Sequence, residues 1–350
     1  MTIRRLAMLL SVVLTFGVAA CGGEDDNDSG GGGGAAATQE SGTPAAGGGE
    51  EGGNVKIAFS APGADHGWMA AITENARDEA KELGDVDLIA SEGVTDSAAQ
   101  ADQIETLINQ KPDALVVLPQ DGAALTPVAQ KAERAGIPVI NIDRLFTKPD
   151  AATATVLGDN YQIGVLAADY IAEQLKCNGN VVEIQGLAGI SVTTDRSKGF
   201  KDELKTKCPG GGVKIVASQP GDFNPDTGLK VMENILQAQK KIDAVYTHDD
   251  DMAQGVVQAI RNAGRDKETF LTGVGGSQDA MKQIKEGGLY RATFLYNPNM
   301  AATAVNMARL VALGSGFSEL VPAEVPRQMV VPAAVVTKDN VAQYEKYAFN

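Results

Sequence analysis

From residue 54 onward, short runs of apolar and β-branched residues alternate with longer segments whose apolar positions recur at helical spacing. Segments 68–83 and 252–264 show the helical pattern clearly. The short runs predict strands at residues 55–60, 86–91, 114–119, 138–143, 154–158, 180–186, 213–219, 244–249, 269–275 and 291–296. Strands that alternate with helices form parallel sheets covered on both faces. This part of the chain is about 300 residues long, more than one hydrophobic core usually serves. The predicted fold class is therefore α/β, with two doubly wound parallel-sheet lobes.

The first 20 residues have a different pattern: two arginines and then an apolar run. These are the n-region and h-region of a signal peptide, too short to span a membrane comfortably. The run ends in VAAC at Cys21, which resembles a bacterial lipobox. That resemblance implies cleavage before Cys21 and attachment of lipid to its thiol. The alternative is ordinary secretion with a chance cysteine at the cleavage point.

Residues 21–53 contain the anchor cysteine and a segment that has the composition of a tether. Of residues 22–53, 13 are glycine, seven are acidic and none is basic, so the segment cannot form a hydrophobic core. A glycine-rich coil of this length has a root-mean-square reach of about 30 Å. We therefore expect an exported protein, lipid-anchored at the outer face of the cytoplasmic membrane. Whether that face borders a periplasm or forms the cell surface stays open.

The two other cysteines are Cys177 and Cys208, an even pair in an exported chain. Each falls at the end of a predicted helix, which makes a disulfide geometrically plausible. Two unpaired thiols are the alternative. No C-x-x-C motif or Cys/His cluster is present, so we expect no metal and no cofactor.

The chain has a formal net charge of −15. Nucleic-acid-binding proteins carry a basic patch or stripe, so nucleic acid is excluded as a partner.

In doubly wound sheets, ligands bind beyond the carboxyl ends of the strands. Carboxylates, arginines and aromatic rings follow the predicted strands at these ends: Asp65, His66 and Trp68; Asp143 and Arg144; Asp195 and Arg196; Asp222 and Phe223; His248, Asp249, Asp250 and Asp251; and Tyr296. Carboxylates accept hydrogen bonds from hydroxyl groups, arginines donate to oxygen atoms, and flat rings cover apolar C–H faces. This combination of side chains suits a carbohydrate.

The chain resembles the ribose-binding type of periplasmic binding protein over residues 55–340. The resemblance rests on VINIDR (139–144), VEIQGLAGISVTTDRSKGF (182–200), ASQPGDFNPDTGLKVMENIL (217–236) and DDDMAQGVVQAI (249–260). It implies that Asp143, Arg144 and Arg196 hold sugar hydroxyls. It also implies that Trp68 and Met69 occupy the positions of the family's aromatic pair. His66 would occupy a position that makes a polar contact with the ligand, and Phe223 the position of a phenylalanine that stacks on it. Asp249 stands where the family often has asparagine, and Tyr296 where it usually has glutamine.

A glycine-rich segment departs from the family pattern, and an acidic triplet needs an assignment of its own. The family motif G-F-D-G is Gly273-Val274-Gly275-Gly276 here, so one hydroxyl acceptor is gone and ribose itself does not follow. Asp249 is assigned to the ligand, whereas Asp250 and Asp251 are expected to cap a helix or face solvent, and His248 to be structural. The acidic triplet lacks the spacing of a calcium loop.

The resemblance implies a three-segment hinge near Asp159-Asn160, Asn297-Pro298 and Arg327-Gln328. The N-terminal lobe would then comprise residues 54–158 and 297–327, and the C-terminal lobe residues 159–296 and 328–350. We expect a monomer that is not an enzyme and that captures a monosaccharide or sugar alcohol for the permease subunits of an ABC importer. Its only contact with the membrane would be the lipid anchor. The alternative function is sugar sensing for a chemoreceptor or sensor kinase.

Overall fold

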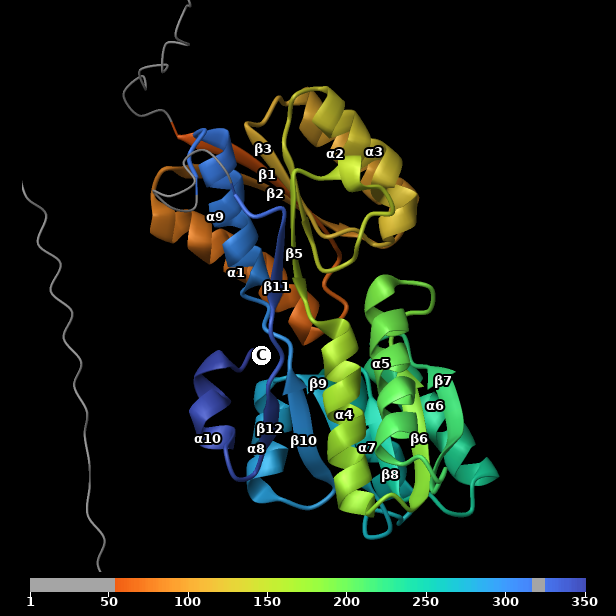
Figure 1. The fold of residues 1–350 in the computed structure, drawn as a ribbon. Helices are drawn as coiled ribbons and strands as arrows, with labels where there is room; N and C mark the ends of the chain where they lie inside the picture. The colour runs from red at the N-terminus through yellow and green to blue at the C-terminus, as the bar shows by residue number, and fades with distance from the viewer. Residues whose placement is uncertain (1–53, 317–324) are drawn as a thin grey trace, which may run out of the picture. The chain divides into compact units, whose positions relative to one another are not determined.

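The computed structural model describes residues 54–316 and 325–350, in which two six-stranded sheets form the cores of two lobes (Figure 1). The predicted signal peptide, Cys21 and the tether lie outside these residues. Every neighbouring pair in the first sheet is parallel. Its strands, in spatial order, are β11 (Gln328–Val331), β5 (Ala154–Gly158), β4 (Val139–Ile142), β3 (Ala114–Val117), β1 (Val55–Pro62) and β2 (Val86–Val94).

The second sheet repeats this order, with one antiparallel strand at its edge. Its strands are β12 (Val335–Thr337), β10 (Tyr290–Leu295), β9 (Phe270–Gly275), β8 (Ala244–Thr247), β6 (Gly179–Gln185) and β7 (Val213–Pro220), with β12 antiparallel to β10. The fold class predicted from the alternating pattern is thus confirmed.

Helices cover both faces of each sheet, as the buried strands require. The first sheet packs against α1 (Gly67–Leu83) and α9 (Met300–Ala312) on one face, and against α2 (Ser97–Asn109) and α3 (Gly122–Arg134) on the other. The second packs against α4 (Asn160–Leu175) and α5 (Ser191–Lys207), and against α6 (Pro225–Ala238), α7 (Asp250–Asn262) and α8 (Gln278–Glu286). The short helices are η1 (Pro149–Ala151), α10 (Val341–Tyr344) and η2 (Glu345–Tyr347). No helix in the described ranges combines the length and apolar character needed to cross a membrane.

The chain passes between the lobes three times. The first two passages follow β5 and β10, where the sequence placed them. The third was expected at Arg327-Gln328, and this position is wrong. Gln328–Val331 pairs in parallel with Thr155–Gly158, so it belongs to the first lobe, and the chain crosses only between Val331 and Val335.

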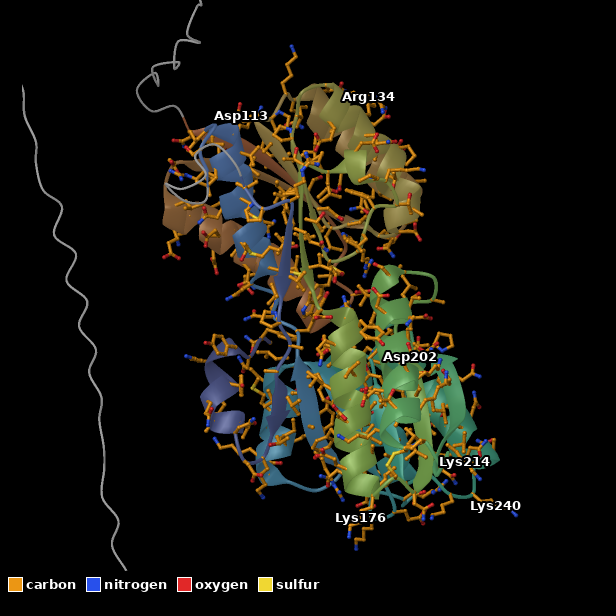
Figure 2. All side chains as sticks on the ribbon, in the orientation of Figure 1. Asp113, Arg134, Lys176, Asp202, Lys214 and Lys240 are labelled. Atoms are coloured by element: carbon orange, nitrogen blue, oxygen red, sulfur yellow. A yellow bond between two sulfur atoms is a disulfide. The ribbon has the colours of Figure 1, made fainter. Side chains whose placement is uncertain are left out.

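Charged side chains that lie at the amino ends of the strands, such as Asp113, Lys176, Lys214 and Lys240, are exposed (Figure 2). The carboxyl ends carry the buried polar residues instead. Asp143, Arg144, Arg196 and Asp249 are each at most 5% exposed. Buried charges require compensating partners, so the carboxyl ends of the strands are where a functional site is expected.

Candidate functional site

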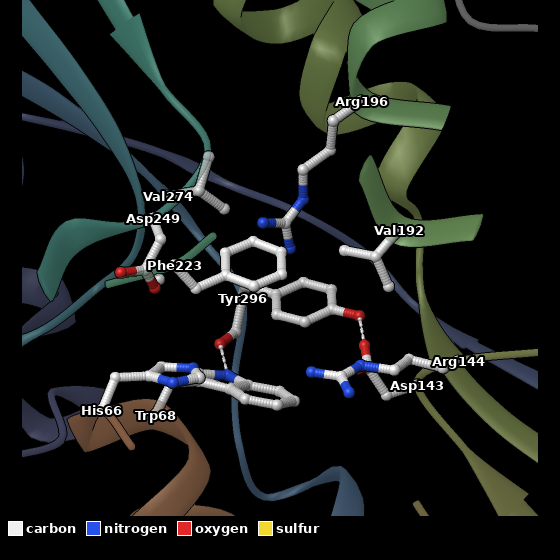
Figure 3. Close-up of a pocket in the computed structure, with 11 residues that line it drawn as sticks. His66, Trp68, Asp143, Arg144, Val192, Arg196, Phe223, Asp249, Val274 and Tyr296 are labelled. Carbon is white, nitrogen blue, oxygen red and sulfur yellow. Dashed lines mark hydrogen bonds and ion pairs between the residues drawn. The ribbon is translucent and has the colours of Figure 1, made fainter. Parts of the chain in front are cut away.

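Residues from both lobes line one cavity at the carboxyl ends of the strands. The empty space between these side chains is about 330 Å³, part of it open to solvent. Its lining consists of His66, Trp68, Asp143, Arg144, Val192, Arg196, Phe223, Asp249, Val274, Gly275 and Tyr296 (Figure 3). The structure therefore brings together every residue that the sequence assigned to the ligand except Met69. Three other carboxylates that follow strands do not line the cavity: Asp65, Asp195 and Asp222.

Met69 does not line the cavity. It is 1% exposed and belongs to the apolar core between α1 and the first sheet. Consecutive residues of a helix point about 100° apart, and here Trp68 lines the cavity whereas Met69 turns into the core. Sequence reasoning missed Val192 because nothing distinguishes an apolar residue in the first turn of α5. Val274 lies in the segment noted for its missing acceptor.

Trp68 and Tyr296 form the aromatic part of the site. Their ring centroids lie 5.3 Å apart, and the indole Nε1 donates to the Tyr296 carbonyl at 2.9 Å. The Tyr296 hydroxyl donates to Asp143 and accepts from Asn160. Burial, together with the charge of Asp143, raises the pKa of Tyr296 well above its usual value, so the hydroxyl stays protonated and remains a donor.

Arg144 is a buried cation with unused hydrogen-bonding capacity. One terminal nitrogen donates to the carbonyl of Gln120 at 2.9 Å, while Nε lies 3.6 Å from Asp143 and has no hydrogen-bond partner in the described structure. A buried donor without a partner costs free energy unless a ligand or water satisfies it. The Asp143–Arg144 pair is thus prepared to donate to a ligand oxygen and to accept from a hydroxyl.

Arg196 approaches the cavity from α5 in the second lobe. Its Nε donates to Asn160 at 2.9 Å and one terminal nitrogen to the His248 carbonyl at 2.5 Å. The guanidinium carbon also lies 4.5 Å from the centroid of the Tyr296 ring, within range of a cation–π contact. These contacts fix the plane of the guanidinium at the cavity wall.

His66 of the first lobe and Asp249 of the second lobe interact electrostatically. Burial by itself lowers the pKa of His66, but the 2.5 Å hydrogen bond with Asp65 and the charge of Asp249 outweigh it, so the pKa is raised. Burial raises the pKa of Asp249 to about 7. Asp249 therefore changes charge near neutral pH, and both side chains can exchange a hydrogen bond with a polar ligand.

The acidic triplet has three separate functions, and the expected assignment was incomplete. Asp249 lines the cavity and is also the N-cap of α7, accepting from Met252 at 2.8 Å. Asp250 is fully buried, not solvated, and accepts from Gly276, Ser277, Tyr290 and Thr293. Asp251 caps a helix, but it is α1 of the other lobe.

His248 lies outside the cavity lining and is fully buried, in keeping with a structural role. Its Nε2 is 3.3 Å from the Glu183 carboxylate, and burial lowers its pKa. In the described ranges, no group of three or more His, Cys, Asp or Glu side chains is arranged to hold a metal.

Phe223 and Asp143 hold unusual backbone conformations on opposite sides of the cavity. Their φ angles are 60° and 64°, in the left-handed region that residues other than glycine rarely adopt. Such conformations cluster at functional sites, where the surrounding structure supports them. The Phe223 ring lies 5.9 Å from His66, so the aromatic surface extends across both lobes.

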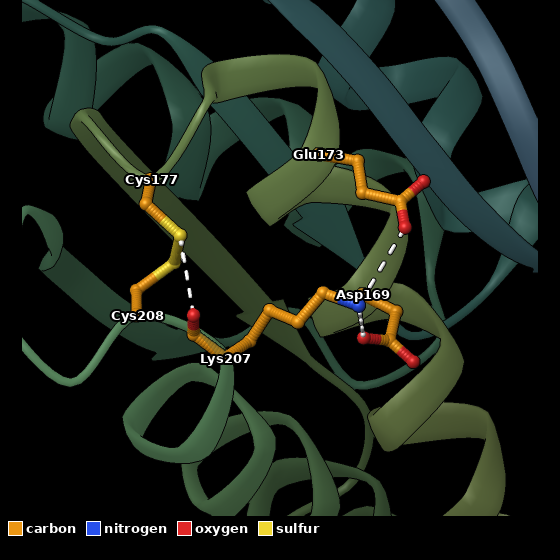
Figure 4. The surroundings of a disulfide bond; sticks show 5 residues. All are labelled: Asp169, Glu173, Cys177, Lys207 and Cys208. Atoms are coloured by element: carbon orange, nitrogen blue, oxygen red, sulfur yellow. Dashed lines mark hydrogen bonds and ion pairs between the residues drawn. A yellow bond between two sulfur atoms is a disulfide. The ribbon is translucent and has the colours of Figure 1, made fainter.

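The structure joins Cys177 and Cys208 in a disulfide (Figure 4). Cys177 follows α4 and Cys208 follows α5, so the bond ties these helices together beside the amino end of β6. Lys207 adds ion pairs to Asp169 and Glu173 of α4, at 2.9 and 3.5 Å. The bond lies at the opposite end of the sheet from the cavity.

Comparison with known proteins places this geometry in a family. Residues 57–316 match the periplasmic binding protein domain. A ribose import binding protein of Bacillus subtilis (strain 168) is 34% identical over 244 residues, which cover 70% of this chain and 77% of that protein. The galactofuranose-binding protein YtfQ of Escherichia coli (strain K12) is 36% identical over 258 residues, covering 71% and 79%.

A solved structure extends the likeness to the whole fold. An ABC transporter solute-binding protein from Bacillus halodurans C-125 with bound myo-inositol superposes with a TM-score of 0.77 at 27% identity, covering 84% of this chain and 98% of the other. The matched domain covers most of the chain and the solved structure superposes over both lobes, so the chain belongs to the periplasmic binding protein family.

Proposed function

We propose that this chain is an extracytoplasmic solute-binding protein that captures a monosaccharide or sugar alcohol between its lobes. It delivers this ligand to the permease of an ABC importer and catalyses no reaction. The observation that carries the proposal is the buried lining of the cavity. Two arginines and two aspartates converge there beside aromatic rings, and Arg144 Nε lacks a partner in the described structure.

The chemistry of the lining favours a neutral polyhydroxylated ligand. Each lobe contributes one arginine and one aspartate, so the donors and acceptors can alternate around a ring of hydroxyls. Trp68 and Phe223 supply apolar surface for C–H groups. Relatives named for ribose, galactofuranose, apiose and xylitol support the same ligand class.

Lipid attachment at Cys21 and the glycine-rich tether complete the proposal. They would hold the binding lobes near the permease while leaving them free to move. Labelling with a radioactive fatty acid, compared between the unaltered protein and Cys21→Ser, tests the anchor directly. Label in both proteins would refute attachment at this cysteine.

A sensing role is the second candidate. It is supported by the fructose-binding periplasmic domain of a hybrid two-component system, which superposes with a TM-score of 0.75 at 27% identity. Neighbouring genes that encode a permease and an ATPase would favour import, whereas a neighbouring sensor kinase would favour signalling.

The decisive experiment uses Trp68, the only tryptophan in the chain, as its probe. We expect one sugar or polyol from a panel of pentoses, hexoses and alditols to change its fluorescence and to raise the unfolding midpoint. A ligand at a thousand times its Kd adds about 4 kcal/mol to the free energy of unfolding.

The matched variants are Arg144→Met and Arg134→Met, a buried and an exposed arginine of the same lobe. Loss of hydrogen bonds from a charged donor costs about 1.5–3 kcal/mol, so Arg144→Met is expected to weaken binding by about 10- to 150-fold. Arg134→Met should bind normally. A panel in which no compound binds would refute the carbohydrate assignment.

A further inference from the structure

The N-terminus of α1 has no cap from its own lobe. His66 occupies the N-cap position with extended backbone, and its side chain makes no capping hydrogen bond. By contrast, α2 in the same lobe is capped locally, because Asp96 accepts from the backbone N–H of Ala99 at 2.8 Å. The first N–H groups of a helix need acceptors, so α1 must obtain one from elsewhere.

The acceptor comes from the second lobe. Asp251 Oδ2 accepts from the backbone N–H of Gly67 at 2.8 Å and lies 3.4 Å from that of Trp68. Asp251 belongs to the first turn of α7, directly beyond the residues that follow β8. A carboxylate at a helix N-terminus satisfies these donors and also interacts favourably with the helix dipole.

Gly67 makes the approach of the two lobes possible. A Cβ atom at this position would lie 2.4 Å from the carbonyl oxygen of Asn350 and 3.2 Å from Asp251 Oδ2. Asn350 belongs to the second lobe, where Phe349 accepts a hydrogen bond from Gln278 at 2.8 Å. Glycine is the residue that permits such close contact.

We propose that Asp251 is a positioning residue that caps α1 only when the lobes are closed. It does not line the cavity, but it holds the turn that carries His66 and Trp68. It thereby fixes both side chains over the ligand and slows ligand release. This inference rests on the proposed function, since it requires lobes that open and close around a ligand.

The test compares Asp251→Ala with Asp96→Ala, one cap supplied by the other lobe and one supplied locally. The probe is Trp68 fluorescence in stopped-flow experiments with the tightest-binding sugar of the panel. Loss of an N-cap aspartate corresponds to about a fivefold change in an equilibrium constant. We expect Asp251→Ala to raise koff about fivefold and to leave kon within about twofold. It should lower the unfolding midpoint of the ligand-free protein by less than Asp96→Ala does, because Asp251 also lies in the first turn of α7 and interacts with the dipole of that helix. Asp96→Ala is expected to lower that midpoint and leave koff unchanged.

Two further variants test the cap without removing the side chain. Asp251→Asn keeps an acceptor oxygen and should restore most of the slow release. Gly67→Ala obstructs the contact from the other side. Because a Cβ at Gly67 meets the Asn350 carbonyl as well as Asp251, Gly67→Ala should raise koff at least as much as Asp251→Ala. The double variant should then release ligand no faster than Gly67→Ala alone.

The outcomes separate the inference from the proposed function. If the unaltered protein binds sugar but Asp251→Ala leaves koff unchanged, the capping role is wrong and the function stands. If Asp251→Ala lowers the ligand-free midpoint as Asp96→Ala does, Asp251 is an ordinary structural cap and the inference is overturned. If the unaltered protein binds no sugar in the panel, the proposed function fails, and the inference fails with it.

Discussion

Replacing Glu183 by glutamine should destabilise the second lobe in a way that depends on pH. The carboxylate is fully buried on β6 and accepts from Ser218 at 2.5 Å, with Lys201 Nζ at 3.3 Å and His248 Nε2 at 3.3 Å. Burial alone would raise the pKa of Glu183. Its hydrogen bonds, that to His248 first, outweigh burial and lower the pKa from 4.5 to about 2.

The size of the effect follows from that shift. A pKa depressed by about 2.5 units stabilises the folded protein by at most about 3 kcal/mol when the group is ionised in both states. This stabilisation is present above about pH 4.5 and is lost as the pH falls toward 2. His248 is kept uncharged at neutral pH because burial lowers its pKa, so the full value is an upper bound.

Urea denaturation of the unaltered protein and of Glu183→Gln, at about pH 6 and about pH 3, measures the effect. We expect a deficit of about 2–3 kcal/mol in the variant at the higher pH and a smaller deficit at the lower one. The control is Glu345→Gln, whose carboxylate is 45% exposed and pairs with Lys285, worth less than about 1 kcal/mol. An equal deficit for Glu183→Gln at both pH values would refute the reasoning.

Three other changes test the site and its support. Because burial raises the pKa of Asp249 to about 7, a ligand hydroxyl that donates to the ionised carboxylate should bind about tenfold more tightly at about pH 8 than at about pH 6. Titrations should show this slope in the unaltered protein and its loss in Asp249→Asn; a flat profile in both would contradict it. Gly186→Ala would place a Cβ 2.0 Å from the ring of Phe223, and we expect fluorescence titration to show at least a fivefold loss of affinity, about 1 kcal/mol or more. Replacing Cys177 and Cys208 by serine should lower the free energy of unfolding in urea by about 3.5 kcal/mol and leave affinity unchanged. Altered affinity would show that the disulfide influences the cavity.

Most residues of the cavity could be predicted because they follow strands of parallel sheets, not because each has a sequence motif of its own. Runs of β-branched residues locate the ends of strands, and parallel sheets bring all their carboxyl ends to one edge. Asp143, Arg196 and Phe223 are far apart in the chain, yet each follows a strand or opens the next helix. The strand ends bring these residues to one edge, and the resemblance to the family selected them from the other residues there.

The predictions for the third hinge passage and for Asp251 failed because the partners of these residues lie far away in the sequence. Val330 and its neighbours form a strand only because they pair with β5, which lies about 170 residues earlier. Asp251 has the composition of a local cap or a solvated side chain, but its partners lie 183 and 184 residues away. Periodicity reports burial and local propensity, so it cannot distinguish a cap within one lobe from a cap across two.

Tyr296 shows why a substitution in the hinge can alter the site, because it belongs to the second hinge passage and also lines the cavity. It follows β10 at the second passage between the lobes, and its ring lies against Gly158, which ends β5 at the first passage. A Cβ at Gly158 would lie 2.0 Å from that ring, so the ring can occupy this place only while residue 158 is glycine. The same tyrosine bonds Asp143 through its hydroxyl and Trp68 through its carbonyl. A movement of the hinge must therefore move an acceptor and a stacking surface together. This coupling is why Trp68 fluorescence should report the arrangement of the lobes as well as contact with a ligand.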